Sequence, residues 1–162
     1  MTDLQIFTTG GTIDKVYFDA LSEFQVGESG IGNMLAEANI SYSYEITPLM
    51  RKDSLELTDE DRGIIRQAIL KSKPKNILVT RGTDTMVTTA QYVSDVTDKT
   101  IIFTGSMLPA THRATDAVFN IGFAIAACRL LKPGTYLTMN GQVFDPAQVI
   151  KDRQAGLFKE TL

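Results

Sequence analysis

The chain has 162 residues, of which 43% are hydrophobic and 22% are charged, and its formal net charge is −3. This length suits one domain, over residues 1–162, that buries a core without disulfides or metal ions. A slightly acidic chain lacks the basic surface with which proteins bind nucleic acids or anionic membranes, so we expect neither as a partner.

The single cysteine, Cys128, excludes an internal disulfide and lies in the apolar run 121–131, where we expect it to pack in the core. The chain does not open with a charged and then apolar signal segment, and no apolar stretch is long enough to span a bilayer. These features favour a cytoplasmic protein.

Short apolar runs alternate along the chain with segments of helical periodicity. Strands are expected at residues 4–8, 42–49, 77–80, 101–104 and 136–139, and helices at residues 31–38, 59–70, 85–93 and 114–131. The clearest helix start has Thr58 as N-cap before three acidic residues. Strands joined by helical crossovers predict a parallel sheet with helices on both faces, a three-layer α/β sandwich. Near the C terminus, Asn140-Gly141 followed by Val143 and Phe144 predicts a β-hairpin.

The first expected strand ends in a turn with two glycines. Residues 8–13 read Thr-Thr-Gly-Gly-Thr-Ile, so Gly10 and Gly11 let the backbone turn sharply and present the hydroxyl of Thr12 at the end of the strand. A nucleophile or an anion site can be built in this way. A Gly-Gly pair between threonines also occurs as a plain tight turn.

The third expected strand ends in a comparable turn, in which Gly82 is followed by Thr83 and Asp84 and then by a helix. In an open sheet of order 2-1-3-4-5, the first and third strands are neighbours, and ligands bind where their exits flank the switch point. Thr12 and Thr83 would then face one another across one crevice. The alternative is that Thr83 or Asp84 only caps the helix.

Taken together, residues 9–13 (TGGTI) and 81–86 (RGTDTM) resemble the paired signature of the bacterial-type L-asparaginase/glutaminase family, whose N-terminal domain is a flavodoxin-like α/β sandwich. The similarity continues through residues 104–109 (TGSMLP), Asp116 and Asn120, and it reaches Asn140, Asp145 and Lys151. Essentially the whole chain corresponds to that domain. We therefore expect a mainly parallel, flavodoxin-like sheet in a short, single-domain member.

The resemblance implies hydrolysis of a side-chain amide through a threonine acyl-enzyme. Thr12 would be the attacking nucleophile, whose hydroxyl needs activation because it is barely nucleophilic at its own pKa. Thr83, Asp84 and Lys151 would form the second catalytic group, in which Lys151 accepts a proton and Thr83 orients the attacking water.

The resemblance also implies how the substrate is held. Asp84 would bind the α-ammonium group, and Ser54, next to Asp53, matches the residue of the family that binds the α-carboxylate. Backbone N–H groups at the turns of Gly11 and Gly82 are suited to stabilise the developing oxyanion.

The sequence departs from the family at three points. Full-length members have a second domain, which supplies an acidic residue to the neighbouring subunit's site, and we expect a short member without it. Phe24 stands where the family's tyrosine base is expected, so Tyr17 is the nearest candidate for the hydroxyl relay, or else an aromatic residue covering the edge of the core. Leu55 replaces the glutamine that follows the substrate-binding serine.

We expect a cytoplasmic L-asparaginase with weak affinity for asparagine and little glutaminase activity. It should need no cofactor and no metal, and it should self-associate as a dimer or tetramer. Two rival functions stay open. One is hydrolysis of another small amide, which keeps Thr12, Thr83, Asp84 and Lys151 but not Ser54. The other is a catalytically degenerate module that binds amino acids.

Three other features have simpler interpretations. His112, with no second ligand at metal spacing, is expected to be a solvated loop residue. Phe119, Phe123 and Leu130 recur at helical spacing and predict a core face. Arg81 is either a guide for carboxylates entering the crevice or a surface ion-pair partner.

Overall fold

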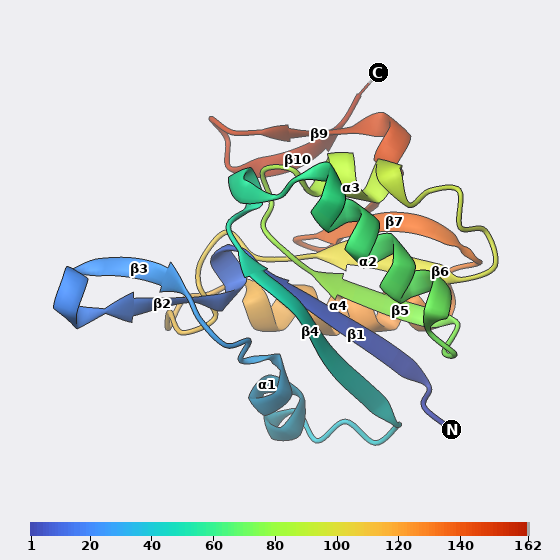
Figure 1. The fold of residues 1–162 in the computed structure, drawn as a ribbon, viewed down its shortest axis with the longest axis horizontal. Helices are drawn as coiled ribbons and strands as arrows, with labels where there is room; N and C mark the ends of the chain where they lie inside the picture. The colour runs from blue at the N-terminus through green and yellow to red at the C-terminus, as the bar shows by residue number, and fades with distance from the viewer. Residues whose placement is uncertain (162) are drawn as a thin grey trace.

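A computed structural model of the protein describes residues 1–161. Its centre is a six-stranded sheet with the order β4-β1-β5-β6-β7-β8 (Figure 1). The strands are β1 (Leu4–Gly10), β4 (Tyr44–Lys52), β5 (Asn76–Thr80), β6 (Thr100–Thr104), β7 (Gly134–Met139) and β8 (Gln142–Phe144). The first five in this order pair in parallel and β8 is antiparallel to β7. Counted along the chain, the parallel strands lie in the predicted order 2-1-3-4-5.

Four helices cover the two faces of the sheet, which makes the predicted three-layer sandwich. They are α1 (Ile31–Glu37), α2 (Asp59–Lys71), α3 (Met86–Tyr92) and α4 (Ala117–Leu130). Successive side chains of β5 point to opposite faces of the sheet, so the core has two halves. Ile77 and Val79 pack with α2 and α3, whereas Leu78 packs with α1 and α4. Thr58 caps α2 as predicted, since its hydroxyl accepts from the Asp61 N–H.

Two hairpins follow the parallel strands. The turn between β7 and β8 has positive φ angles of 50° at Asn140 and 85° at Gly141, which suits a two-residue hairpin and confirms the predicted one. Strands β9 (Val149–Asp152) and β10 (Leu157–Glu160) form the second hairpin. Val149 and Phe158 anchor it in the core beside α3, so its position is fixed by packing.

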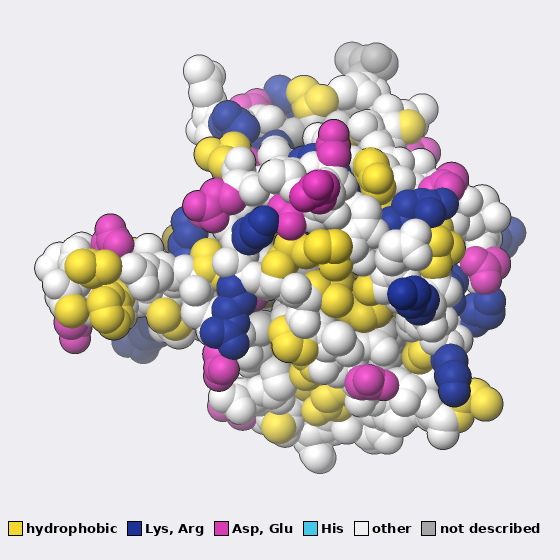
Figure 2. All heavy atoms as spheres, viewed as in Figure 1, with side chains coloured by type: hydrophobic (Ala, Val, Ile, Leu, Met, Phe, Trp, Pro, Cys, Tyr) yellow, Lys and Arg dark blue, Asp and Glu magenta, His cyan; other side chains and the backbone are white. Residues whose placement is uncertain are grey.

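The segment after β1 forms a third hairpin, which the sequence did not predict. Strands β2 (Lys15–Phe18) and β3 (Glu23–Val26) pair only with each other and project from the body as an arm (Figure 1). Figure 2 shows hydrophobic side chains gathered on this arm. Its large exposed apolar residues are Val16, Tyr17, Phe18, Leu21 and Phe24. Because neither face of the arm is buried, its sequence carries no clear period.

Helix α4 corrects one prediction about the core. Phe119 and Leu130 are 59% and 83% exposed, so the core face predicted from their spacing is wrong for both. Smaller residues face the sheet instead, among them Ala124 and the predicted core thiol of Cys128, which is buried. Apolar residues occur all round this helix, so periodicity could not select the buried side.

Candidate active site

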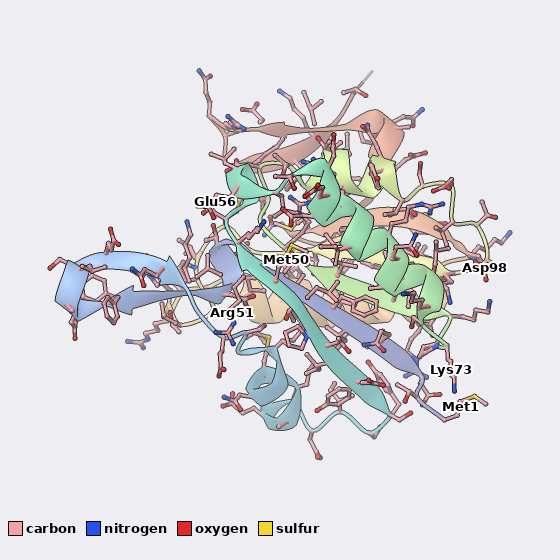
Figure 3. The ribbon with its side chains drawn as sticks, viewed as in Figure 1. Met1, Met50, Arg51, Glu56, Lys73 and Asp98 are labelled. Atoms are coloured by element: carbon pink, nitrogen blue, oxygen red, sulfur yellow. The ribbon has the colours of Figure 1, made fainter. Side chains whose placement is uncertain are left out.

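Three turns meet at the end of the sheet where the parallel strands finish. In Figure 3, Glu56 marks this end, whereas Met1 and Lys73 mark the opposite one. A Cβ at Gly11 would overlap the backbone of Gly82, and a Cβ at Gly82 would lie 2.5 Å from the Ser54 Cβ. Glycine lets the loops after β1 and β5 touch, and the φ of +85° at Gly11 also requires it. The structure therefore brings the turns of Thr12 and Thr83 together, as the strand order predicted.

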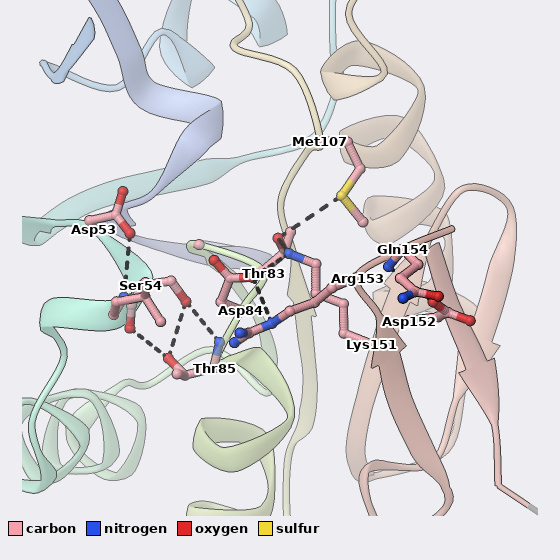
Figure 4. A network of polar contacts seen from close by, with 12 residues as sticks. Asp53, Ser54, Thr83, Asp84, Thr85, Met107, Lys151, Asp152, Arg153 and Gln154 are labelled. Carbon is pink, nitrogen blue, oxygen red and sulfur yellow. Dashed lines mark hydrogen bonds and ion pairs between the residues drawn. The ribbon is translucent and has the colours of Figure 1, made fainter. Parts of the chain in front are cut away.

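Lys151 links the turn after β5 to the β9–β10 hairpin. Its Nζ donates to the Thr83 Oγ1 at 2.7 Å and to the Asp84 Oδ1 at 2.5 Å (Figure 4). Val149 and Lys151 lie on the same side of β9, so anchoring Val149 in the core directs Lys151 to Thr83. The Thr83 side chain is itself buried, and the lysine side chain is 15% exposed. A lysine amino group and a hydroxyl thus lie in contact in a partly dehydrated position.

Thr12 lies in the 3₁₀ helix η1 (Thr12–Asp14), directly after the Gly10-Gly11 turn, and is half-buried. Its hydroxyl makes no hydrogen bond within residues 1–161. The Gly11 N–H donates to the Lys52 carbonyl at 2.9 Å and is occupied. The Gly82 and Thr83 N–H groups have no hydrogen bond in the described chain, so a role for them as oxyanion donors stays a prediction.

Ser54 belongs to a buried polar cluster in the 3₁₀ helix η3 (Ser54–Glu56). Its Oγ accepts from the Thr85 N–H at 2.8 Å and from the Arg81 Nη2 at 3.2 Å. The Arg81 guanidinium also donates to Thr85, to Thr89 and to the Gly82 carbonyl. Both roles considered for Arg81 are wrong: it is fully buried and ties the turn of Gly82 to α3. Burial, and the nearby Arg62, lower its pKa to about 9.

Asp53 lies beside this cluster but is partnered by a different cation. Its carboxylate pairs with the Lys15 Nζ at 2.8 Å and accepts from the Leu55 N–H. The hydrogen bond from Lys15 lowers the pKa of Asp53. Lys15 begins the arm, so this ion pair ties the arm to the turn after β4, and a direct role of Asp53 in binding substrate stays a prediction.

Tyr17 lies on the arm, where it is 53% exposed. It is the cross-strand partner of Phe24, and the two rings meet edge to face at 5.5 Å. The candidate hydroxyl therefore lies opposite the phenylalanine that replaces the family's tyrosine. Its hydroxyl makes no hydrogen bond within residues 1–161, so its role as a relay stays a prediction.

A third wall of the site comes from the loop after β6. The Asp116 carboxylate accepts from the Met107 and Leu108 N–H groups at 3.0–3.1 Å, which holds the Met107 sulfur near the Thr83 hydroxyl. Asn120 donates to the Gly105 carbonyl at 2.9 Å. These residues of the family resemblance therefore shape the loops of the site.

Two charged residues near the site escaped sequence reasoning. Asp14, two positions after Thr12, is buried at the base of the arm, and this burial raises its pKa to about 6. No sequence signal marks it, because Ser29 and Arg51 are brought to its carboxyl only when the chain folds. Arg153 has its Nε 3.6 Å from the Asp84 Oδ1. The period of two that relates Lys151 to Arg153 was a usable signal.

The remaining predictions concern groups outside the site. His112 is exposed in the loop before α4, as predicted, with its ring 5.7 Å from that of Phe24. Among residues 1–161, no group of three or more His, Cys, Asp and Glu side chains could hold a metal ion. In the same part of the chain, no helix combines the length and apolar character needed to cross a membrane.

A parallel sheet of order 2-1-3-4-5 with polar side chains at its switch point defines a flavodoxin-like α/β domain, a class in which ligands bind at this point. The family described as asparaginase, N-terminal, matches residues 3–157. The chain belongs to this family, as its two glycine-threonine turns predicted.

Relatives and solved structures agree with this assignment. A glutaminase-asparaginase from Acinetobacter glutaminasificans is 32% identical over 166 residues, covering 90% of this chain and 48% of that protein. The L-asparaginase 2 of Escherichia coli is 27% identical, covering 93% of this chain and 47% of its own. The solved thermostable L-asparaginase from Thermococcus kodakarensis superimposes with a TM-score of 0.83 at 26% identity, over 97% of this chain and 50% of its own. The chain spans about half the length of these relatives.

Proposed function

We propose that the protein hydrolyses the side-chain amide of L-asparagine to L-aspartate and ammonia through a threonine acyl-enzyme. The observation that carries this proposal is the contact of the Lys151 Nζ with the Thr83 Oγ1 at 2.7 Å, beside the turn of Thr12. Membership of the asparaginase family, together with relatives named for this activity, supports the choice of substrate.

The proposed reaction has two halves. The Thr12 oxygen attacks the amide carbon, the carbon–nitrogen bond breaks, and the threonine proton leaves with the nitrogen as ammonia. Water held by Thr83 then attacks the ester carbon, the bond between that carbon and the Thr12 oxygen breaks, and a water proton is relayed by Thr83 and Lys151 so that the Thr12 hydroxyl is restored. The free N–H groups of Gly82 and Thr83 donate to the oxyanion in both halves.

Ammonia release from purified protein tests the mechanism. Thr12→Val and Lys151→Met each remove one reacting group and should lower kcat by a factor of about 10³ or more. Thr97→Val and Lys132→Met are matched controls, because both are exposed just before β6 and β7, at the opposite end of these parallel strands from the three turns, and should leave kcat unchanged. Unchanged turnover in Thr12→Val or Lys151→Met would show that the proposed mechanism is wrong.

We further propose that glutamine is a poor substrate. Leu55 replaces the glutamine of the family and is 67% exposed beside Ser54, so it offers no amide to a longer substrate. Ammonia release from asparagine and from glutamine at equal concentration tests this selectivity. Equal turnover would refute the selectivity.

A second candidate substrate class is favoured by the contacts of Ser54. Its Oγ already accepts two hydrogen bonds within the protein, and its own proton faces the Thr85 Oγ1 at 3.1 Å because the Thr85 hydroxyl donates to the Ser54 carbonyl, so a substrate carboxylate would have to displace one of these contacts. An amidohydrolase acting on another small amide would not need this contact. Ser54→Ala should raise KM for asparagine without changing kcat if the serine binds substrate. An unchanged KM would favour the other amide.

The protein is also proposed to be a cytoplasmic homo-oligomer. Exposed Phe119 and Leu130 on α4, together with exposed Tyr17 and Phe24 on the arm, provide apolar surface suited to contact with another copy. Sedimentation at micromolar concentration should give a dimer or tetramer, and a monomer at every concentration would exclude it. Cell fractionation tests the location.

A further inference from the structure

Arg153 lies beside Asp84, next to the turn after β5. It follows β9 in a turn that Asp152 closes, because the Asp152 Oδ1 accepts from the Gln154 and Ala155 N–H groups at 3.1 and 3.0 Å. An ion pair of 2.8 Å between Asp152 and Lys159 braces the turn across the hairpin. The guanidinium is therefore presented by an ordered turn.

Two cations share the carboxylate of Asp84. The Asp84 Oδ1 lies 2.5 Å from the Lys151 Nζ and 3.6 Å from the Arg153 Nε. Figure 4 shows these two residues on one side of Asp84, with Ser54 and Thr85 on the other. The three side chains sum to one positive charge when both cations are protonated. An ammonium group that approaches Asp84 therefore meets cations already in place, whereas a carboxylate meets an attractive field.

Arg153 also has unused hydrogen-bond donors. Its side chain is 66% exposed, and within residues 1–161 its guanidinium has no hydrogen bond and no ion pair other than that with Asp84. The other cations near the three turns are engaged. Lys15 pairs with Asp53, Lys52 with Asp61, and the buried Arg81 donates inside the protein.

We infer that Arg153 determines substrate specificity by binding the carboxylate of the substrate. The site then prefers small amides that carry a carboxylate group, and an α-ammonium group contributes less to binding. The inference rests on the proposed amide hydrolysis. A planar guanidinium can give a carboxylate two parallel hydrogen bonds, a geometry that Ser54 cannot offer because its hydroxyl is engaged by Thr85 and Arg81.

Three amides separate the two recognition elements. L-Asparagine carries both groups, succinamate lacks the α-ammonium, and 3-aminopropanamide lacks the carboxylate. Arg153→Gln should raise KM about 10- to 100-fold for asparagine and succinamate, with kcat within about twofold, because charge-assisted hydrogen bonds are lost. The KM for 3-aminopropanamide should stay the same or fall, since Asp84 is relieved of one competing cation. Arg153→Lys should give an intermediate loss, and Arg66→Gln on α2, which breaks an ion pair with Asp95, is the matched control.

Failure of the inference is distinguishable from failure of the proposed function. An equal KM change for all three amides, or none, would overturn the role of Arg153 while hydrolysis stands. If the wild type released no ammonia at all, the proposed hydrolysis would fail. In that case, calorimetric titration of L-aspartate and succinate into the wild type and Arg153→Gln still tests whether Arg153 binds a carboxylate. Weaker binding of both ligands to the variant supports the inference, and equal binding overturns it.

Discussion

Replacing Asp14 with asparagine is expected to stabilise the protein at neutral pH. Burial at the base of the arm raises the pKa of this carboxyl from 3.8 to about 6, although contact with Ser29 and the charge of Arg51 lower it in part. At about 1.36 kcal/mol for each pH unit between these values, ionising Asp14 in the folded protein costs about 3 kcal/mol. An asparagine side chain at this position would keep the shape without the charge.

Because of Asp14, the free energy of unfolding of the wild type should fall as the pH rises. Below pH 3.8 Asp14 is protonated in both the folded and the unfolded states and costs nothing. As the pH rises to about 6 the unfolded chain loses its proton first, so the stability of the wild type falls. Above that pH the whole cost is present, and Asp14→Asn should be up to about 3 kcal/mol more stable.

Urea unfolding of the wild type and Asp14→Asn from pH 4 to pH 8 measures this difference. For a slope of about 2 kcal/mol per molar urea, the midpoints should coincide near pH 4 and differ by about 1.5 M at pH 7.5. Asp53→Asn is the control of opposite sign, because Lys15 lowers the pKa of Asp53. That variant should lose stability at neutral pH and recover it towards acid. A difference for Asp14→Asn that does not change with pH would refute the reasoning.

Three further predictions concern packing and burial. Gly82→Ala should lower the free energy of unfolding by at least about 1–3 kcal/mol and remove most of the ammonia release, because its Cβ would meet Ser54 at 2.5 Å. Gly122→Ala in α4 has open space and should raise the free energy of unfolding by about 0.5–1 kcal/mol, and thermal melts compare the two variants. Arg81→Met leaves buried acceptors without donors and should cost more than about 2 kcal/mol in urea unfolding; a neutral result would show that the cluster is dispensable. Burial raises the pKa of the Cys128 thiol, so a thiol reagent should label it only after denaturation, and rapid labelling of the native protein would contradict the structure.

Local patterns were sufficient for most of the fold. Apolar runs such as Ile77–Thr80 and the cap at Thr58 depend on neighbours in the chain, so the five parallel strands, the four helices and the hairpin at Asn140-Gly141 were all predictable. The arm was not, because a hairpin exposed on both faces has no hydrophobic period. Helix α4 was placed correctly but given the wrong buried face at Phe119 and Leu130, since that choice depends on the sheet opposite.

The sequence by itself determined which chemical groups are available at the site, because the two glycine-threonine turns and Lys151 are legible as motifs. Only the tertiary structure decided how these groups are paired. It buried Arg81 in contact with Ser54, buried Asp14 at the base of the arm, and set Lys151 and Arg153 against the carboxylate of Asp84. These pairings join residues up to 69 positions apart, between Asp84 and Arg153, and the contacts exist only once the sheet and the β9–β10 hairpin have packed. Long-range electrostatics follows from packing and leaves no local pattern to read.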